Sequence, residues 1–160
     1  MSPNEIQNSS FSFEDRNDYH RFQKILQTAG FKEKSILNAL NFSDLSSIRE
    51  KDISLLLKRS RDESPLNTLI RLFLIEAACP VQKVCEAIKP LKIESMVKAD
   101  LIRIEGSDVF GQVKLLPFKE FIIAFDQPRM LLTDRASEYV MGIGSSTITL
   151  ANLTIRKSVQ

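Results

Sequence analysis

The sequence predicts an α+β fold that is mainly α-helical and has a small β part. Three observations lead to this prediction. Apolar residues recur at helical spacing through most of residues 13–100. Prolines divide the middle of the chain into short helical stretches, at Pro65, Pro80 and Pro90. Between Leu101 and Glu105, apolar and polar residues alternate as they do in a half-buried strand.

The first part of the chain predicts a helical region. Residues 1–12 are mostly polar, and we expect a disordered start there. Within 13–63, the apolar positions fall on one face of each of three stretches, and Gly30 follows the first of them as a C-terminal cap. The expected helices are 13–29, 33–40 and 51–58.

Residues 64–126 predict a winged-helix-like module. Ser64 can cap a helix whose first turn contains Pro65, and the apolar stripe that follows extends to Ala78. Two further helices and a β-ribbon follow, and the third helix has the position of a recognition helix. The helices after the first are 80–88 and 90–99, and the strands are 101–105, 112–116 and 120–126.

Composition and residue inventory exclude several classes of site. The net charge is +2, from 22 basic and 20 acidic residues, so no large basic field attracts nucleic acid. His20, Cys79 and Cys85 supply at most three soft ligands, whereas a closed zinc site needs four. We therefore predict no metal site, and we interpret both cysteines as buried free thiols of a cytoplasmic protein. No apolar stretch approaches the roughly 20 residues that span a bilayer, so we expect no membrane contact.

Basic residues gather around the third helix of the module. In a DNA-binding winged helix, such side chains contact phosphates. Acidic residues such as Glu94 are interleaved with them, so we favour a solvated face of mixed charge that makes at most weak nucleic-acid contacts. The candidate nucleic-acid contacts are Lys89, Lys92, Lys98 and Arg103.

No combination of residues forms a complete catalytic site. His20 lies on a polar helix, and no G-x-S-x-G motif is present. The aromatic residues of the strands, Phe110, Phe118, Phe121 and Phe125, are interpreted as core residues rather than stacking platforms.

A glycine- and hydroxyl-rich segment lies near the end of the chain, around Gly142 and Gly144. A dinucleotide site needs a strand, a glycine turn and a helix, but Thr147 replaces the third glycine of G-x-G-x-x-G. Too few residues follow for the next strand, so we expect a flexible loop that meets something absent from this chain.

The order of segments resembles the N-terminal, pre-catalytic region of a bacterial group of class I AdoMet-dependent methyltransferases, related to HemK-like and small-domain rRNA methyltransferases. The resemblance extends over about residues 35–157. In that group, a similar V-x-G-x-G-x-S-x-T-L-A segment lies just before a strand that ends in Asp-x-Gly-x-Gly. The residues that carry the resemblance are 65–74, Pro80-Val81, 97–101, Leu116-Pro117 before Asp126, and 138–151.

The resemblance implies that residues 127–160 are a segment leading to a catalytic domain that this chain lacks. This chain alone would bind no cofactor and have no activity, and the full-length protein would be a transferase that uses S-adenosylmethionine. The implied role is recognition of a protein or RNA substrate. The residues implied to lie next to the cofactor in the full-length protein are Gly142, Gly144, Ser145, Ser146 and Thr147.

Two other readings stay open, a stand-alone winged-helix DNA-binding regulator and a pure protein-interaction module. The apolar residues of the tail, Val140 and Met141 among them, would lack their partner in this chain. We therefore expect either a mobile tail or a homodimer formed through the C-terminal segment.

Overall fold

The computed structural model describes residues 12–44, 52–127, 132 and 139–142. About 47% of these residues are helical and 19% lie in strands, which form small antiparallel sheets. The prediction of a mainly α, α+β chain is confirmed. The disordered start predicted for residues 1–12 lies outside the described residues, except for Ser12.

Three helices form the first part of the chain: α1 (Arg16–Thr28), α2 (Glu33–Leu40) and α3 (Ile53–Arg59). The Asp15 carboxylate caps α1 by accepting a hydrogen bond of 2.8 Å from the backbone N–H of Asn17. Gly30 follows α1 with a φ of 73°, as predicted for a glycine after a helix end. These helices agree with the predicted ones to within a few residues.

The next helix begins as predicted and ends earlier. In α4 (Pro65–Ile70), the Ser64 hydroxyl accepts a hydrogen bond from the backbone N–H of Asn67 at 3.2 Å. The helix continues as a π-helical turn, η3 (Arg71–Ile75), and Glu76 ends it with a left-handed φ of 62°. The predicted extension to Ala78 is therefore wrong.

The remaining elements are β1 (Cys79–Pro80), α5 (Val81–Ala87), α6 (Ile93–Lys98), β2 (Ile102–Glu105), β3 (Asp108–Gly111), β4 (Val113–Phe118) and β5 (Phe121–Asp126). The three strands β1, β3 and β2 form one antiparallel sheet in that order, and β4 and β5 form a separate antiparallel hairpin. The sequence predicted one ribbon without β1 or β3. The structure instead has two hairpins, because the chain pairs again between Asp108 and Gly111 before it enters β4.

Two arginines fasten the helices at one end of the molecule. The Arg59 guanidinium donates a hydrogen bond of 2.7 Å to the backbone oxygen of Leu40, at the end of α2. Arg71 donates to the Ser60 hydroxyl at 3.2 Å and to the backbone oxygen of Leu57 at 3.0 Å. Since the last carbonyls of a helix lack intrahelical partners, these bonds satisfy groups that would otherwise need water.

One hydrophobic core joins the first helices to the module. Its buried side chains come from α1 through β4 and include Phe22, Phe73, Met96 and Leu115. The Phe22 and Phe73 rings meet edge to face with centroids 6.0 Å apart, so α1 packs directly on η3.

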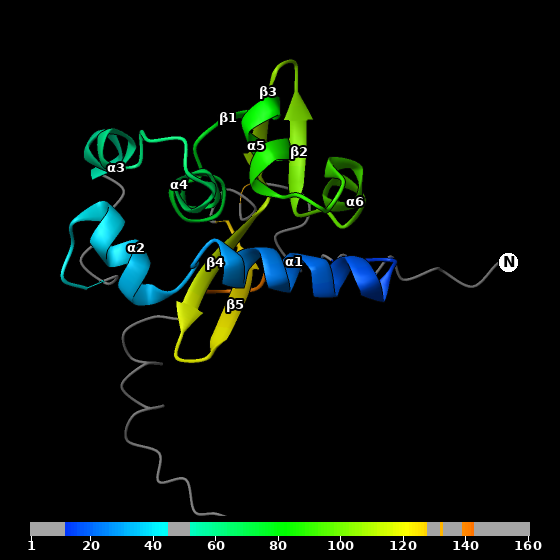
Figure 1. Cartoon of the computed structure of the whole chain (residues 1–160), viewed down its shortest axis with the longest axis horizontal. Coiled ribbons are helices and arrows are strands. Elements are labelled where there is room, and N and C mark those ends of the chain that lie inside the picture. The colour runs from blue at the N-terminus through cyan, green and yellow to red at the C-terminus, as the bar shows by residue number, and fades with distance from the viewer. Residues whose placement is uncertain (1–11, 45–51, 128–131, 133–138, 143–160) are drawn as a thin grey trace, which may run out of the picture.

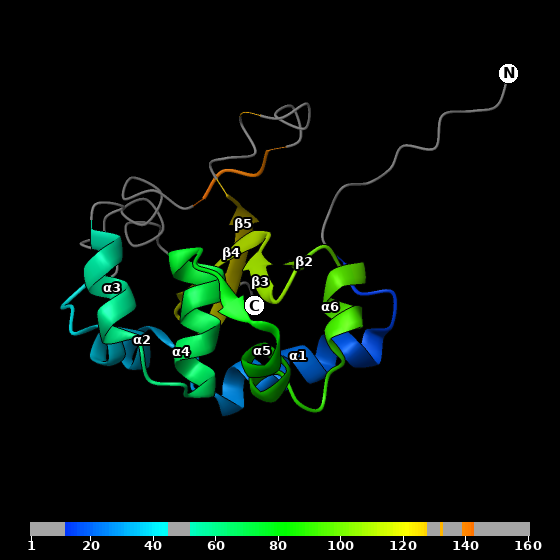
Figure 2. The same ribbon diagram turned by 90° about the horizontal axis from the view of Figure 1, so that it is seen from above.

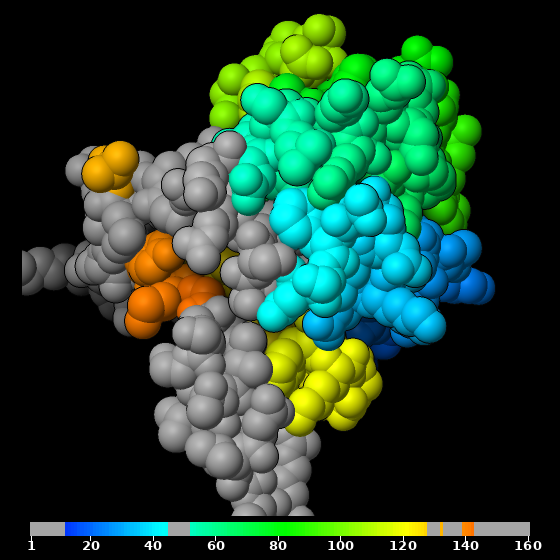
Figure 3. All heavy atoms as spheres, turned by 90° about the vertical axis from the view of Figure 1, so that its left-hand side faces the viewer, coloured from blue at the N-terminus to red at the C-terminus, as the bar shows by residue number. Residues whose placement is uncertain are grey.

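The elements surround this core in a simple arrangement. Figures 1 and 2 place α2 and α3 at one end of the molecule and α6 at the other, with α4 and α5 between them. In Figure 3, side chains of α2 and α3 cover the end of the molecule, and the β4–β5 hairpin projects beside them. Within the described residues, every helix is too short or too polar to cross a bilayer.

Candidate functional site

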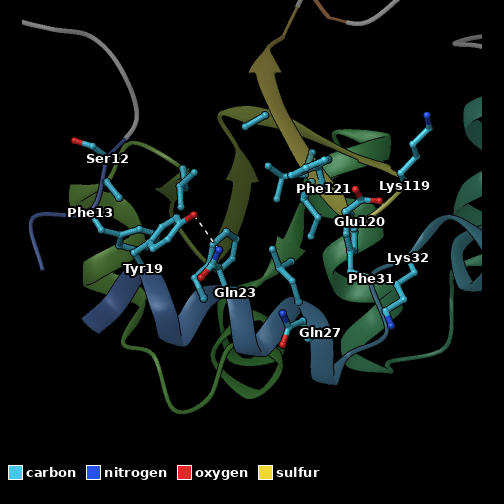
Figure 4. Close-up of a pocket in the computed structure, with 17 residues that line it drawn as sticks. Ser12, Phe13, Tyr19, Gln23, Gln27, Phe31, Lys32, Lys119, Glu120 and Phe121 are labelled. Atoms are coloured by element: carbon cyan, nitrogen blue, oxygen red, sulfur yellow. Dashed lines mark hydrogen bonds between the residues drawn. The ribbon is translucent and has the colours of Figure 1, made fainter. Parts of the chain in front are cut away.

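A groove of about 760 Å³ lies between α1 and the β4–β5 hairpin (Figure 4). Most ligand sites are pockets of roughly this size, lined by apolar and aromatic side chains with a few polar groups. The floor is formed by buried residues of the core, including Phe22, Leu26 and Phe31. The groove is therefore a hollow above the core with two separate walls.

The first wall is a face of α1. Tyr19, Gln23 and Gln27 are spaced four residues apart, which puts their side chains in one row along the helix. The Gln23 amide donates a hydrogen bond of 2.9 Å to the Tyr19 hydroxyl, and the Phe13 ring meets the Tyr19 ring at a centroid distance of 6.5 Å. These two contacts hold an aromatic ring that is 47% exposed.

The second wall is the tip of the β4–β5 hairpin. Lys119 and Glu120 form its turn, and Lys119 has a left-handed φ of 56°. Phe121 follows with 58% of its side chain exposed, and Ile122 is also exposed. The interpretation of Phe121 as a core residue is wrong, because no layer of the described residues covers the two-stranded sheet at this position.

The charged residues of the groove are Lys32, Lys119 and Glu120. Lys32 and Lys119 lie at the same end of the groove, on opposite walls (Figure 4). The Lys119 ammonium lies 5.4 Å from the centroid of the Phe118 ring. The arrangement offers exposed aromatic surface, amide groups and a small excess of positive charge.

The basic residues around α6 have acidic neighbours. Arg103 lies over the Phe110 ring at 4.4 Å and pairs with the Glu105 carboxylate, and the Lys98 ammonium is 4.0 Å from Glu14. Lys89 and Lys92 are exposed. Two of the four candidate contacts, Lys98 and Arg103, thus lie beside acidic side chains.

The helix α1 also contacts α6 through a polar pair. The Ser95 side chain hydrogen-bonds the Asp18 carboxylate and is the first cause of its lowered pKa, and Arg21 adds a hydrogen bond at 2.6 Å. This contact brings the Asp18 carboxylate to α6, near Lys92, and so lowers the positive charge that a DNA-binding helix would present to phosphates.

The glycine–serine segment is described only at its start. Gly142 lies against the Phe125 ring, where an added Cβ would be 2.6 Å from a ring carbon. Gly144, Ser145, Ser146 and Thr147 lie outside the described residues. Val140 is fixed by two hydrogen bonds: its backbone N–H donates to the Asp126 carboxylate at 2.7 Å, and its backbone oxygen accepts from the Asp126 N–H at 3.1 Å. Residues 139–142 therefore dock on the domain itself.

The cysteines and the histidine have no common site. Within the described residues, no group of three potential metal ligands occurs. His20 is exposed on α1 and lies 3.4 Å from the Gln23 side chain. Cys79 is buried as predicted, whereas Cys85 is only partly buried, so the prediction of two buried thiols is wrong for Cys85.

The two thiols should differ in reactivity. Burial raises the pKa of Cys79 to about 11, so at about pH 8 its thiolate is on the order of one molecule in a thousand. We expect iodoacetamide to modify Cys85 first in the folded protein and both cysteines after unfolding in urea, as followed by mass spectrometry. Equal native rates would contradict the packing around Cys79.

A family model described as a domain of unknown function, DUF7059, matches residues 28–112, which is more than half of the chain. The chain belongs to this family. The matched segment runs from the end of α1 through β3, so the two walls of the groove, α1 and β4–β5, lie almost wholly outside it. No curated protein and no solved structure matches the chain significantly.

Sequence reasoning missed the groove. The signals that could have indicated it are the row of Tyr19, Gln23 and Gln27 beside the apolar face of the helix, and the charged turn that precedes Phe121. Neither signal predicts that the two segments face each other.

Proposed function

We propose that this chain is the non-catalytic N-terminal region of an AdoMet-dependent methyltransferase and contributes to substrate recognition. The observation that carries the proposal is the anchoring of Val140 by Asp126, which is only 8% exposed. Val140 begins the segment that resembles the one preceding the AdoMet motif in the methyltransferase group. A domain that holds this segment would fix the entry of the chain into a catalytic domain.

In the proposed full-length protein, S-adenosylmethionine would supply the methyl group. The resemblance to the methyltransferase group implies that Gly142, Gly144, Ser145, Ser146 and Thr147 would lie next to the cofactor. The proposed partners are the chain's own catalytic domain and a protein or RNA substrate, with self-association through the C-terminal segment as a further contact. The free cysteines support a cytoplasmic location.

The second reading, a DNA-binding regulator, has less support. Lys92 and Lys98 lie at α6, but two carboxylates lie close to them. Asp18 of α1 is hydrogen-bonded to Ser95 of α6, and Glu14 lies beside Lys98. These carboxylates reduce the positive potential that phosphate binding requires. Duplex DNA that stays bound in a sequence-specific complex at about 200 mM salt would favour the regulator instead.

The proposal predicts a clear difference in cofactor binding. This 160-residue chain should bind S-adenosylmethionine more weakly than about 10 μM, equivalent to about −7 kcal/mol. The full-length protein should bind S-adenosylmethionine measurably. Its sequence should contain Asp-x-Gly-x-Gly within about ten residues after Gln160. Isothermal titration of both proteins checks this. Micromolar binding by the short chain, or none by the longer one, would defeat the proposal.

A further inference from the structure

We propose that the groove between α1 and the β4–β5 hairpin binds a short unpaired stretch of nucleotides, with bases stacked on its exposed aromatic rings. This inference rests on the proposed substrate-recognition role and narrows the substrate class to RNA. It concerns a surface other than the lysines around α6, because Lys89, Lys92 and Lys98 do not line the groove.

The aromatic residues supply the first argument. Tyr19 and Phe121 are 47% and 58% exposed and stand on opposite walls of the groove. Exposed rings of this size are costly in water unless something covers them. Every base presents a flat π-face, so such rings serve as stacking platforms for unpaired nucleotides.

The contacts around Tyr19 supply the second argument. Its hydroxyl accepts a hydrogen bond from Gln23, and its ring packs against the edge of Phe13 and beside His20, 5.6 Å away. A ring held on several sides loses little conformational freedom on binding, which favours stacking. Gln27, one helical turn further along, offers both a donor and an acceptor to a base edge.

The charges supply the third argument. Lys32 and Lys119 are exposed at one end of the groove, from opposite walls, and among the described residues neither forms an ion pair. Two ammonium groups at one end of the groove can follow a phosphate backbone as it leaves the stacked bases. Glu120 opposes them, so we expect moderate rather than tight binding.

An apolar peptide is the other occupant to consider. Such a peptide would favour a continuous apolar stripe, whereas the α1 wall presents amides between its aromatic positions. A polyanion, unlike an apolar peptide, gains from removal of the Glu120 charge. Glu120→Gln is therefore the variant that best distinguishes a nucleic acid from an apolar peptide.

The test measures fluorescence anisotropy with the full 160-residue chain at about 50 mM salt. The probes are a labelled RNA, oligouridine of about eight nucleotides, and the DNA strand of equal length, oligothymidine. A double-stranded nucleic acid of equal length is the third probe. We expect saturable binding of the single strands, tighter for oligouridine, and weaker binding of the duplex. Preference for oligothymidine would assign the groove to DNA and overturn the RNA assignment.

The variants separate stacking from charge. Tyr19→Ala and Phe121→Ala should each weaken oligouridine binding by about fivefold or more. Glu120→Gln should strengthen it, and the double variant Lys32→Gln/Lys119→Gln should reduce the slope of log K against log salt by about 1.4. Lys58→Gln, on an exposed residue of α3 outside the groove, is the matched charge control and should leave binding within twofold. Thermal melting checks that each variant is folded.

Three results would overturn the inference. They are no saturable oligouridine binding below about 1 mM, binding that survives Phe121→Ala and Tyr19→Ala unchanged, or binding lost equally in Lys58→Gln. Cofactor titration of the full-length protein is run beside these assays. Cofactor binding without oligouridine binding would reject only the groove assignment, whereas oligouridine binding without any cofactor binding would reject only the methyltransferase proposal.

Discussion

Replacing Gly111 with alanine should destabilise the protein by about 3 kcal/mol or more. A Cβ at this position would lie 2.2 Å from the backbone oxygen of Leu72 and 3.0 Å from its carbonyl carbon. Leu72 is fully buried in η3, so the obstacle is backbone rather than the end of a flexible side chain. Relief of the clash requires β3 to move away from the π-helical turn.

Gly106→Ala is the matched control. Gly106 has a φ of 61°, and no heavy atom lies within 4 Å of an added Cβ. Only the left-handed backbone opposes alanine there, at a cost of about 1–2 kcal/mol. Urea denaturation of both variants measures the difference. Should Gly111→Ala cost no more than Gly106→Ala, the close approach of β3 to η3 would be disproved, and failure of Gly111→Ala alone to fold would agree with it.

The same position links the two sheets. Gly111 ends β3 one residue before the first residue of the hairpin, Gln112 lying between them, and the buried Gln127 side chain donates a hydrogen bond of 3.0 Å to the Gly111 backbone oxygen. This bond ties the end of the β4–β5 hairpin to the first sheet. A partly folded Gly111→Ala protein should therefore also lose the groove, because one of its walls is that hairpin.

Local signals predicted the helices well. The capping serine and first-turn proline at Ser64-Pro65, and the glycine after α1, act through neighbouring backbone groups and so can be seen in the sequence. The strand β1 could not be predicted in this way. It has two residues, and its existence depends on pairing Cys79 with Val109, thirty positions away.

The early end of the fourth helix also has a tertiary cause. The apolar stripe continues to Ala77, but Glu76 adopts a left-handed conformation and its carboxylate pairs with Lys114 of β4 at 2.6 Å. Helical periodicity does not register such a contact between distant segments. The pairing of Lys114 with Glu76 could therefore not be predicted from the sequence.

The groove depends on tertiary placement even more. In β4, buried and half-buried residues alternate, whereas β5 is exposed at Phe121 and Ile122 and becomes buried only at Asp126. An apolar run such as 121–125 has the same pattern whether another layer covers it or not. Sequence alone could thus not separate a core strand from the wall of a binding groove.

Replacing Phe73 with alanine should cost about 3–5 kcal/mol of unfolding free energy. The ring is fully buried in η3 and meets Phe22 of α1 edge to face. Its removal leaves a cavity where the first helix joins the module, and the closely packed backbone of η3 limits collapse around it. Val97→Ala, at a position that is 40% exposed, should change stability by about 0.5 kcal/mol or less.

The number of steps in the unfolding transition tests the shared core as directly as the midpoint of that transition does. Since Phe22 and Phe73 connect α1 to the module, the protein should unfold in one cooperative step by circular dichroism and by calorimetry. A double-mutant cycle with Phe22→Ala should show a coupling of about 0.5–1.5 kcal/mol from the ring pair. Two separate transitions, with Phe73→Ala shifting only one of them, would mean that α1 and the module fold independently, and the groove between α1 and the hairpin would then have no fixed first wall.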